Sequence, residues 1–127
     1  MKTIKQRYKI NASTRRVWNA LVNPKIIAKW GGGPAKMTDD VGFRFSLWGG
    51  KIFGKNISVE KNKLLVQEWF GGKWDKASIV NFTLKEKNGV TIINLVHEDI
   101  PNYEEKGLKK DWKQNYLGPL KKFLEEK

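Results

Sequence analysis

The sequence predicts an α+β fold in which a curved antiparallel sheet of about six strands wraps around one long C-terminal helix. Residues 103–127 place apolar side chains at every fourth position, which is the spacing of an amphipathic helix. Residues 43–97 alternate apolar and polar side chains between turn signals, as the strands of a half-exposed antiparallel sheet do. Residues 13–30 have helical spacing, so we expect two short helices after the first strand.

The N-terminal part of the chain predicts one strand followed by these two helices. Residues 3–10 alternate, with Ile4 and Ile10 on one face and basic side chains on the other. Ser13 suits a helix N-cap, because its hydroxyl can accept a hydrogen bond from a first-turn amide. Pro24 should end the first helix and open the second, since proline has no N–H and fits the first helical turn.

Five further strands should follow, each bounded by turn residues. We expect them at residues 43–48, 51–60, 63–70, 78–85 and 91–97. Gly49-Gly50 and Asn88-Gly89 are hairpin signals, because tight hairpin turns need residues that tolerate positive φ. Gly54, inside the second of these strands, indicates a β-bulge.

The long C-terminal helix is the element that the rest of the chain should cover. Its apolar stripe consists of Leu108, Trp112, Tyr116, Leu120 and Leu124. At about 1.5 Å per residue, the helix would extend roughly 33 Å, which is the width of a small domain. Gly118-Pro119 interrupts the stripe and predicts a kink, because proline removes one backbone donor and crowds the preceding turn.

The composition excludes several classes of site. The chain has no cysteine and one histidine, which excludes disulfides, thiolate metal sites, a Cys nucleophile and a His-rich metal site. No apolar run reaches the length of a membrane span, and the N-terminus lacks the apolar core of a signal peptide. From these features we expect a cytoplasmic protein that forms a single domain over residues 1–127 and needs no cofactor.

The positive charge is concentrated in the first third of the chain. The formal net charge is +12, and residues 1–38 hold nine Lys and Arg side chains and no acidic one. Such a field attracts acidic partners and speeds their encounter. The candidate contacts for an acidic protein partner are Lys5, Arg7, Lys9, Arg15 and Arg16. Surface lysines also keep proteins soluble, so partner binding and simple solubility remain alternative interpretations.

Nucleic acid is a rival partner for this basic region. Phosphate binding needs clustered Lys and Arg, and base stacking needs exposed aromatic side chains. The clustered charge is present, but the aromatic residues lie at core positions and no nucleic-acid-binding motif matches. The sequence therefore favours a protein partner over nucleic acid.

Several strings of residues occur in a familiar order along the chain. They are INASTRRVWNAL at 10–21 with Pro24 and Trp30 after it, GFRFSLWGGKIFG at 42–54, LVQEW at 65–69 followed by Trp74, GVTIINL at 89–95, Ile100-Pro101, and WKQNYLGPLK at 112–121. This ordered set resembles the conserved domain of the activator of heat-shock protein 90 ATPase family, within the Bet v-like, START-like (SRPBCC) superfamily. The resemblance implies a helix-grip fold, a non-enzymatic chaperone-associated or stress-related binding function, and heat-shock protein 90 as an acidic partner. We also expect a monomer or weak dimer.

The helix-grip fold implies a cavity between the sheet and the long helix. The candidate lining residues are Phe43, Phe45, Leu47, Trp69, Phe82, Leu95, Trp112, Tyr116 and Leu120. Apolar concave sites with a few polar groups are the usual small-molecule sites, so binding of a hydrophobic small molecule or lipid is the alternative function. The same aromatic side chains are large enough to fill the cavity, so both outcomes stay open.

His97, with Glu98 and Asp99 beside it, is the nearest approach to an acid–base cluster in the sequence. A lone histidine at a strand end is more often a structural hydrogen-bonding group than a general base. No Ser-His-Asp set and no metal-ligand spacing is present. We therefore expect no catalytic residue, no metal site and no enzymatic activity.

Overall fold

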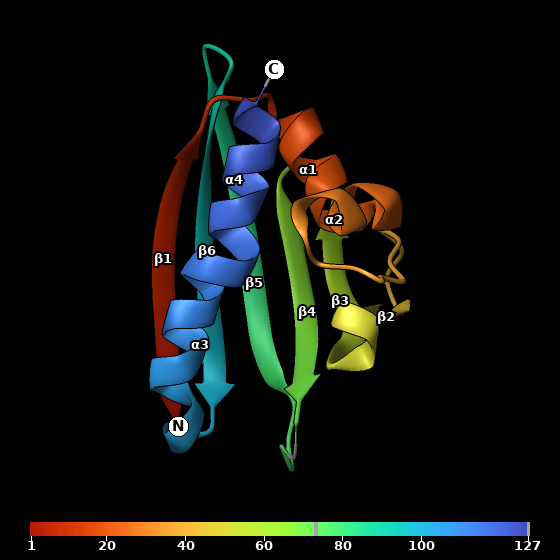
Figure 1. Ribbon diagram of the computed structural model, residues 1–127, viewed down its shortest axis with the longest axis vertical. Coiled ribbons are helices and arrows are strands. Elements are labelled where there is room, and N and C mark those ends of the chain that lie inside the picture. The colour runs from red at the N-terminus through yellow and green to blue at the C-terminus, as the bar shows by residue number, and fades with distance from the viewer. Residues whose placement is uncertain (73, 127) are drawn as a thin grey trace.

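The computed structural model describes residues 1–72 and 74–126. Six strands form one antiparallel sheet with the order β1-β6-β5-β4-β3-β2 (Figure 1). The strands are β1 (Lys2–Ile10), β2 (Arg44–Leu47), β3 (Ile52–Glu60), β4 (Leu64–Gly71), β5 (Ser78–Lys87) and β6 (Val90–Ile100). The helices are α1 (Thr14–Val22), α2 (Pro24–Trp30), the 3₁₀ turns η1 (Trp48–Gly50) and η2 (Asn102–Glu104), α3 (Glu105–Asp111), the π-helix η3 (Trp112–Leu117) and α4 (Gly118–Glu125). This arrangement confirms the predicted α+β helix-grip fold.

The two short helices begin where the sequence places them. The Ser13 hydroxyl accepts a hydrogen bond from the Arg16 amide at 3.3 Å, which makes Ser13 the N-cap of α1. Pro24 occupies the first turn of α2, and the Asn23 side chain accepts hydrogen bonds from the next two amides. The Trp30 indole then donates to the Ala20 carbonyl at 2.8 Å, which ties the two helices together.

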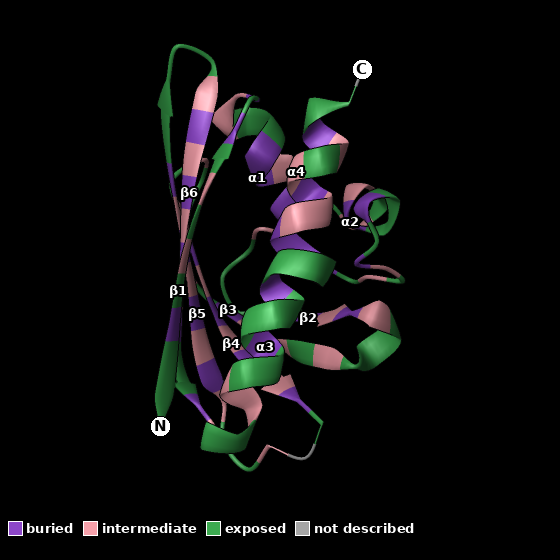
Figure 2. Cartoon of the chain, turned by 60° about the vertical axis from the view of Figure 1, so that its left-hand side comes forward, coloured by how far each residue is buried: buried purple, intermediate pink, exposed green. Residues whose placement is uncertain are grey.

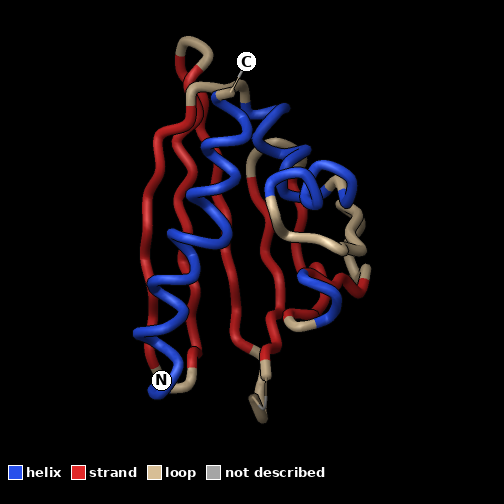
Figure 3. The backbone as a smooth tube through the Cα atoms, in the orientation of Figure 1, coloured by secondary structure: helices blue, strands red, loops and turns tan. Residues whose placement is uncertain are grey.

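All the helices from α1 to α4 lie on one face of the sheet, as Figure 2 shows with the sheet nearly edge-on. The C-terminal helix runs along the strands on that side, while α1 and α2 lie next to it over the other half of the sheet (Figure 3). In β4, Leu65, Gln67 and Trp69 point into this layer and are buried, whereas alternate residues are half-buried. The sheet therefore has one packed face and one face without helices, which we call the open face.

The turns of the sheet combine one predicted connection with one longer than expected. Asn88 and Gly89 have φ of 54° and 78°, as the two central residues of a type I′ hairpin turn require. Between β2 and β3, Gly49-Gly50 belongs to a longer connection, in which Trp48, Gly49 and Gly50 all have positive φ. Positive φ is uncommon for a residue as large as tryptophan, so Trp48 has the least usual backbone conformation of this connection.

The prediction that Gly54 marks a bulge is wrong. The pairing of β3 with β4 shifts register between Asn56 and Ser58, two residues further on. A Cβ atom at Gly54 would overlap the Glu68 carbonyl oxygen and would lie 3.1 Å from the Phe45 ring. Glycine is needed here because β4 and an aromatic ring of β2 approach the backbone closely.

Candidate functional site

The C-terminal helix changes its winding in the middle. Between α3 and α4, residues Trp112–Leu117 form a π-helical turn, in which the Gly118 N–H donates to the Lys113 carbonyl five residues back. A Cβ atom at Gly118 would overlap that carbonyl oxygen, so the turn requires glycine. A proline crowds the carbonyl of the preceding turn in a regular α-helix, and Pro119 follows this wider turn directly. The structure thus accommodates the predicted interruption by π-helical winding ahead of the proline.

A cleft of about 430 Å³ lies beside this π-helical turn. The η1 connection and the start of β3 form one side, β4 forms the floor, and the C-terminal helix forms the other side. The lining residues are Trp48, Lys51, Ile52, Trp69, Leu108, Asp111, Trp112, Asn115 and Tyr116. Its volume lies within the range of natural small-molecule sites, about 300–1,000 Å³.

Four aromatic rings form the wall of the cleft. The Trp69 and Trp112 indoles are stacked, with centroids 4.7 Å apart and an interplanar angle of 27°. Tyr116 lies 4.7 Å from Trp112, and Trp48 meets Tyr116 edge-on at 6.1 Å. These are the offset and edge-to-face arrangements that aromatic rings prefer, so the wall is a packed aromatic surface.

Trp69 is oriented by a buried chain of amide side chains. Its indole N–H donates to the Gln67 Oε1 atom at 2.8 Å, and Gln67 Nε2 donates to Asn56 Oδ1 at 2.9 Å. Asn56 Nδ2 in turn donates to the Thr38 and Asp40 carbonyl oxygens at 2.8 and 3.0 Å. Gln67 and Asn56 are fully buried, so this network both satisfies their amides and fixes the indole.

Trp112 is oriented by His97. The Trp112 indole N–H donates to His97 Nδ1 at 3.0 Å, so Nδ1 is an acceptor and the proton of the neutral ring sits on Nε2. His97 Nε2 then donates to the Ser78 hydroxyl at 2.7 Å, and that hydroxyl donates to the Trp69 carbonyl at 3.0 Å. The chain of donors and acceptors is complete, and it fixes one tautomer of the imidazole.

His97 is held neutral in this network. The side chain is fully buried, and burial lowers the pKa of His97 from its usual 6.5 to about 3. Both ring nitrogens are occupied by protein groups, so neither faces a substrate. The histidine acts as a structural hydrogen-bonding group that connects the C-terminal helix to β5 and β6, as the sequence predicts.

The Tyr116 hydroxyl is the one buried polar atom of the lining that has no hydrogen-bond partner among the described residues. The Tyr116 side chain is 1% exposed. Burial also raises the pKa of this phenol, so it remains a protonated hydroxyl that can donate one hydrogen bond and accept others. An unpaired buried hydroxyl is unfavourable, and this oxygen lies beneath the surface of the cleft, where a molecule in the cleft does not reach it.

The structure brings three of the nine predicted lining residues to the cleft, namely Trp69, Trp112 and Tyr116. Five others are fully or almost fully buried in the core, namely Phe45, Leu47, Phe82, Leu95 and Leu120. Phe43 is partly buried and packs against that core. Phe82 lies nearly parallel to the Tyr116 ring at 5.7 Å and edge-on to Trp112 at 5.7 Å. Aromatic packing thus fills the deep space between sheet and helix, and the cleft lies at its side.

Six lining residues are absent from the set predicted from the sequence. They are Trp48, Lys51, Ile52, Leu108, Asp111 and Asn115. Asp111 and Asn115 lie one turn apart on the helix, and the Asn115 side chain donates to the Asp111 carboxylate at 2.9 Å. The helical spacing of Leu108, Asp111 and Asn115 with Trp112 was the signal that could have identified the helical side of the cleft.

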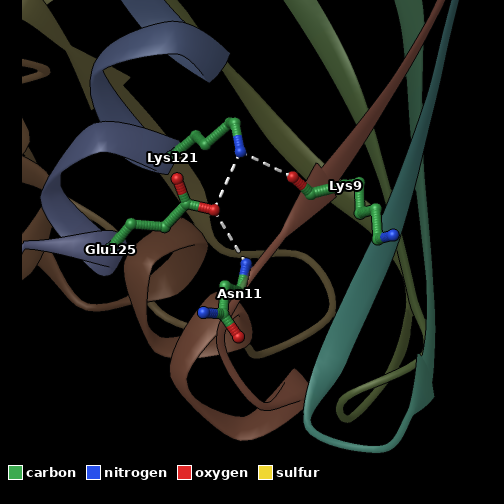
Figure 4. Close-up of polar contacts among 4 residues, drawn as sticks. All are labelled: Lys9, Asn11, Lys121 and Glu125. Atoms are coloured by element: carbon green, nitrogen blue, oxygen red, sulfur yellow. Dashed lines mark hydrogen bonds and ion pairs between the residues drawn. The ribbon is translucent and has the colours of Figure 1, made fainter.

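The five basic candidates for partner binding do not lie on one surface. Lys5, Arg7 and Lys9 are exposed on β1, with side chains directed away from the buried Ile4 and Ile10 and therefore onto the open face. In Figure 4 the Lys9 side chain points away from the helix, while its carbonyl oxygen accepts a hydrogen bond from Lys121. The other two candidates, Arg15 and Arg16, belong to α1 on the packed side of the sheet, and Arg16 donates to the Leu124 carbonyl at 3.0 Å.

The described part of the chain, residues 1–72 and 74–126, contains no group of three or more His, Cys, Asp or Glu side chains placed to hold a metal ion. None of its helices has the length and apolar character needed to cross a bilayer.

Comparison with known proteins places the chain in a family. Residues 11–125 match the family model described as Activator of Hsp90 ATPase homolog 1-like protein. An activator of 90 kDa heat shock protein ATPase homolog from Dictyostelium discoideum is 27% identical over 123 residues, covering 94% of this chain and 32% of that protein. An uncharacterised protein of Schizosaccharomyces pombe is 24% identical over 120 residues, covering 93% of this chain and 36% of that protein. The chain thus spans about a third of the length of these curated relatives.

A solved structure has the same fold as this protein over almost the whole chain. The crystal structure of an HSP90 activator from Plasmodium falciparum superimposes with a TM-score of 0.89 at 23% sequence identity. The match covers 98% of this chain and 96% of that one. The ordered set of strings in the sequence, the helix-grip architecture and the family match over residues 11–125 agree with one another. The chain belongs to the Activator of Hsp90 ATPase homolog 1-like family.

Proposed function

We propose that this chain is a non-catalytic binding protein that docks on a chaperone of the heat-shock protein 90 class and changes its ATPase rate. The observation that carries the proposal is the family match over residues 11–125. His97 is neutral, and both of its ring nitrogens are hydrogen-bonded within the protein. This arrangement supports a role without catalysis. The chain spans about a third of the length of its curated relatives, so both the docking and the effect on the ATPase rate are proposals for this chain.

The docking surface that we propose is the basic end of the open face. Lys5, Arg7 and Lys9 project from β1, and Lys85 lies two strands away on the same face, because Ile92 of β6 pairs with both Lys9 and Lys85. None of these four side chains forms an ion pair with another described residue. Their charge is therefore available to attract an acidic surface on a partner protein.

Charge reversal on β1 should weaken the chaperone complex. We expect Lys5→Glu, Arg7→Glu and Lys9→Glu together to reduce the affinity by at least about tenfold, because each exposed charge contributes up to about 1 kcal/mol. The measurements are the ATPase rate of a purified heat-shock protein 90 with and without this protein, and the dissociation constant by calorimetry.

A matched control separates the open face from net charge. Arg15→Glu, Lys25→Glu and Lys29→Glu change the net charge equally but lie on exposed positions of α1 and α2, across the sheet. This control should bind like the unmodified protein. An equal loss in both triple variants would reject the open face as the docking surface, and no complex with the unmodified protein would reject the function.

A further inference from the structure

The first strand, β1, forms one border of the sheet, and two hydrogen bonds show which of its backbone groups point outward. In an antiparallel strand, the N–H and C=O groups of alternate residues point to opposite edges. The Lys9 carbonyl accepts a hydrogen bond from Lys121 at 2.8 Å. The Asn11 N–H, just beyond the strand, donates to Glu125 at 2.9 Å. Both partners belong to the C-terminal helix, so Lys9 and Asn11 direct these groups away from β6.

The same outward set includes Lys5 and Arg7. The pairing of β1 with β6 keeps one register from Ile4 to Ile10, so the alternation is unbroken between these two residues and Lys9. Among the described residues, no side chain or loop backbone bonds to the N–H or C=O of Lys5 or Arg7. In Figure 1 no strand lies beyond β1 on its outer side. The backbone groups of both residues are therefore free to bond to another strand.

The side chains of the same residues carry positive charge on the open face. Lys5, Arg7 and Lys9 are exposed, and none forms an ion pair with another described residue. On the packed side of β1, Gln6 donates to the Lys109 carbonyl at 3.0 Å, so the C-terminal helix is bonded to that side. A strand added at this border would place one row of its side chains beside three cations.

We propose that β1 takes up an extended acidic segment of the partner protein as an additional antiparallel strand, bonded to the backbone of Lys5 and Arg7 with its carboxylates opposite their side chains. Opposite charges directly across an antiparallel pair stabilise it, and like charges destabilise it. A second copy of β1 would bring the same cations, so charge favours an acidic segment over self-pairing. The added strand ends near Lys9, whose carbonyl is already occupied. The inference rests on the proposed function for the identity of the partner, a chaperone of the heat-shock protein 90 class.

The first test titrates the peptide acetyl-TEVEVET-amide into the unmodified protein by calorimetry. Its glutamates all lie on one face of the extended chain, and in an antiparallel pair the residues opposite Lys5 and Arg7 direct their own N–H groups to β1. N-methylation of the glutamates should therefore weaken binding at least about tenfold. N-methylation of the valines, at equal charge, should change the affinity by less than about twofold, because those N–H groups point away. The lysine analogue acetyl-TKVKVKT-amide should not bind.

Amide hydrogen exchange measured by NMR locates the border that binds the peptide. In the free protein, the Lys5 and Arg7 amides should exchange quickly and the Gln6 and Tyr8 amides slowly, because only the second pair points toward β6. At a free peptide concentration of about ten times its dissociation constant, exchange at Lys5 and Arg7 should slow about tenfold. Slow exchange at Lys5 and Arg7 in the free protein would show that this border is covered and would overturn the proposal.

Two substitutions of Arg7 separate the backbone from the charge. Arg7→Thr and Arg7→Pro both remove one cation, but only proline also removes the outward N–H and places a ring at the border. Proline is tolerated on an outer strand where the N–H faces away from the ladder. Arg7→Thr should weaken peptide binding by no more than about fivefold, and Arg7→Pro at least about tenfold further. Circular dichroism shows whether each variant folds, and the methylated peptides decide the question on the unmodified protein if the proline variant does not.

Equal weakening by the two methylated peptides, equal affinity of the two Arg7 variants, or equal binding of the glutamate and lysine peptides would also overturn the proposal. With a purified chaperone, equal docking of Arg7→Pro and Arg7→Thr would reject strand addition and leave the proposed docking intact. No complex between the chaperone and the unmodified protein would reject the proposed function, whereas the peptide titrations still decide whether β1 takes up an acidic strand. The two failures are therefore distinguishable.

Discussion

Acidification from pH 7 to about pH 4.5 is expected to lower the free energy of unfolding by roughly 3 kcal/mol through His97 alone. The folded state keeps this imidazole neutral down to a pKa of about 3, whereas the unfolded chain takes up its proton near 6.5. Between these values the unfolded state binds more protons, so stability falls as the pH decreases through this window. Above pH 6.5 both states are neutral at this site and the full contribution is present.

The geometry explains why protonation is so unfavourable. His97 Nδ1 accepts the Trp112 N–H, and a proton on Nδ1 would place two donors face to face. The fully buried side chain also has no access to solvent that could stabilise the charge. Charging the ring therefore requires breaking the hydrogen bond that links the C-terminal helix to the sheet.

Urea unfolding of the unmodified protein and of His97→Gln at pH 7 and at pH 4.5 measures this effect. His97→Gln should be less stable at pH 7, because its amide cannot reproduce both hydrogen bonds at the same distance. It should then lose about 3 kcal/mol less on acidification, since the remaining titrating groups are common to both proteins. Parallel pH profiles for the two proteins would show that His97 is not the acid-sensitive group.

Gly118→Ala is expected to destabilise the protein by about 2 kcal/mol, although alanine is a better helix former than glycine by about 1 kcal/mol. A Cβ atom at this position would overlap the Lys113 carbonyl oxygen, which accepts the Gly118 N–H in the π-helical turn. Relieving that overlap requires the turn to rewind, which moves Tyr116 and Asn115 relative to the sheet.

Gly107→Ala is the matched control, because Gly107 also lies in the C-terminal helix but a Cβ atom there would meet nothing within 4 Å. This substitution should stabilise the protein by about 0.5–1 kcal/mol, through helix propensity and the reduced freedom of the unfolded chain. Thermal and urea unfolding of the two variants measure both effects. Stabilisation by Gly118→Ala of the same size as by Gly107→Ala would contradict the requirement for glycine in the turn.

The order of elements could be predicted because its signals are local. Ser13 and Pro24 mark helix starts through the chemistry of one hydroxyl and one ring, and Asn88-Gly89 marks a turn through positive φ. Each of these effects depends on a few consecutive residues. The long C-terminal helix could be predicted because the spacing of its apolar side chains is also a local signal. Its π-helical turn lies within the same apolar stripe, so the spacing of the apolar residues does not distinguish that turn from an α-helix.

The cleft could be predicted only in part, because alternation separates inward from outward side chains but does not locate a void. Phe82 and Trp69 are both inward, and only the second lines the cleft, since Phe82 is covered by Tyr116. Trp48 reaches the cleft through a turn with positive φ at a tryptophan, for which the sequence gives no reason. Such placements are set by packing between distant segments.

Which basic side chains share one face of the protein could also be predicted only in part. Lys9 and Arg15 are close in sequence, but the chain turns from the sheet to a helix between them, and their elements lie on different sides of the sheet. Lys85 is distant in sequence and shares a face with Lys9, because two strand pairings connect them. Clustering along the chain therefore wrongly assigned Arg15 to the same surface as Lys9, and it missed Lys85, which does lie on that surface.

The contact in Figure 4 has a consequence for how copies of this protein meet. β1 is an edge strand, and edge strands can recruit a second chain through unpaired backbone groups. At the end of β1, Lys121 donates to the Lys9 carbonyl at 2.8 Å, and Glu125 accepts the Asn11 N–H at 2.9 Å while pairing with Lys121. An exposed ion pair of this kind adds little to folding stability. Its larger effect is to occupy two backbone groups at this end of the edge strand and to place charge there, which disfavours pairing with a second chain at that end.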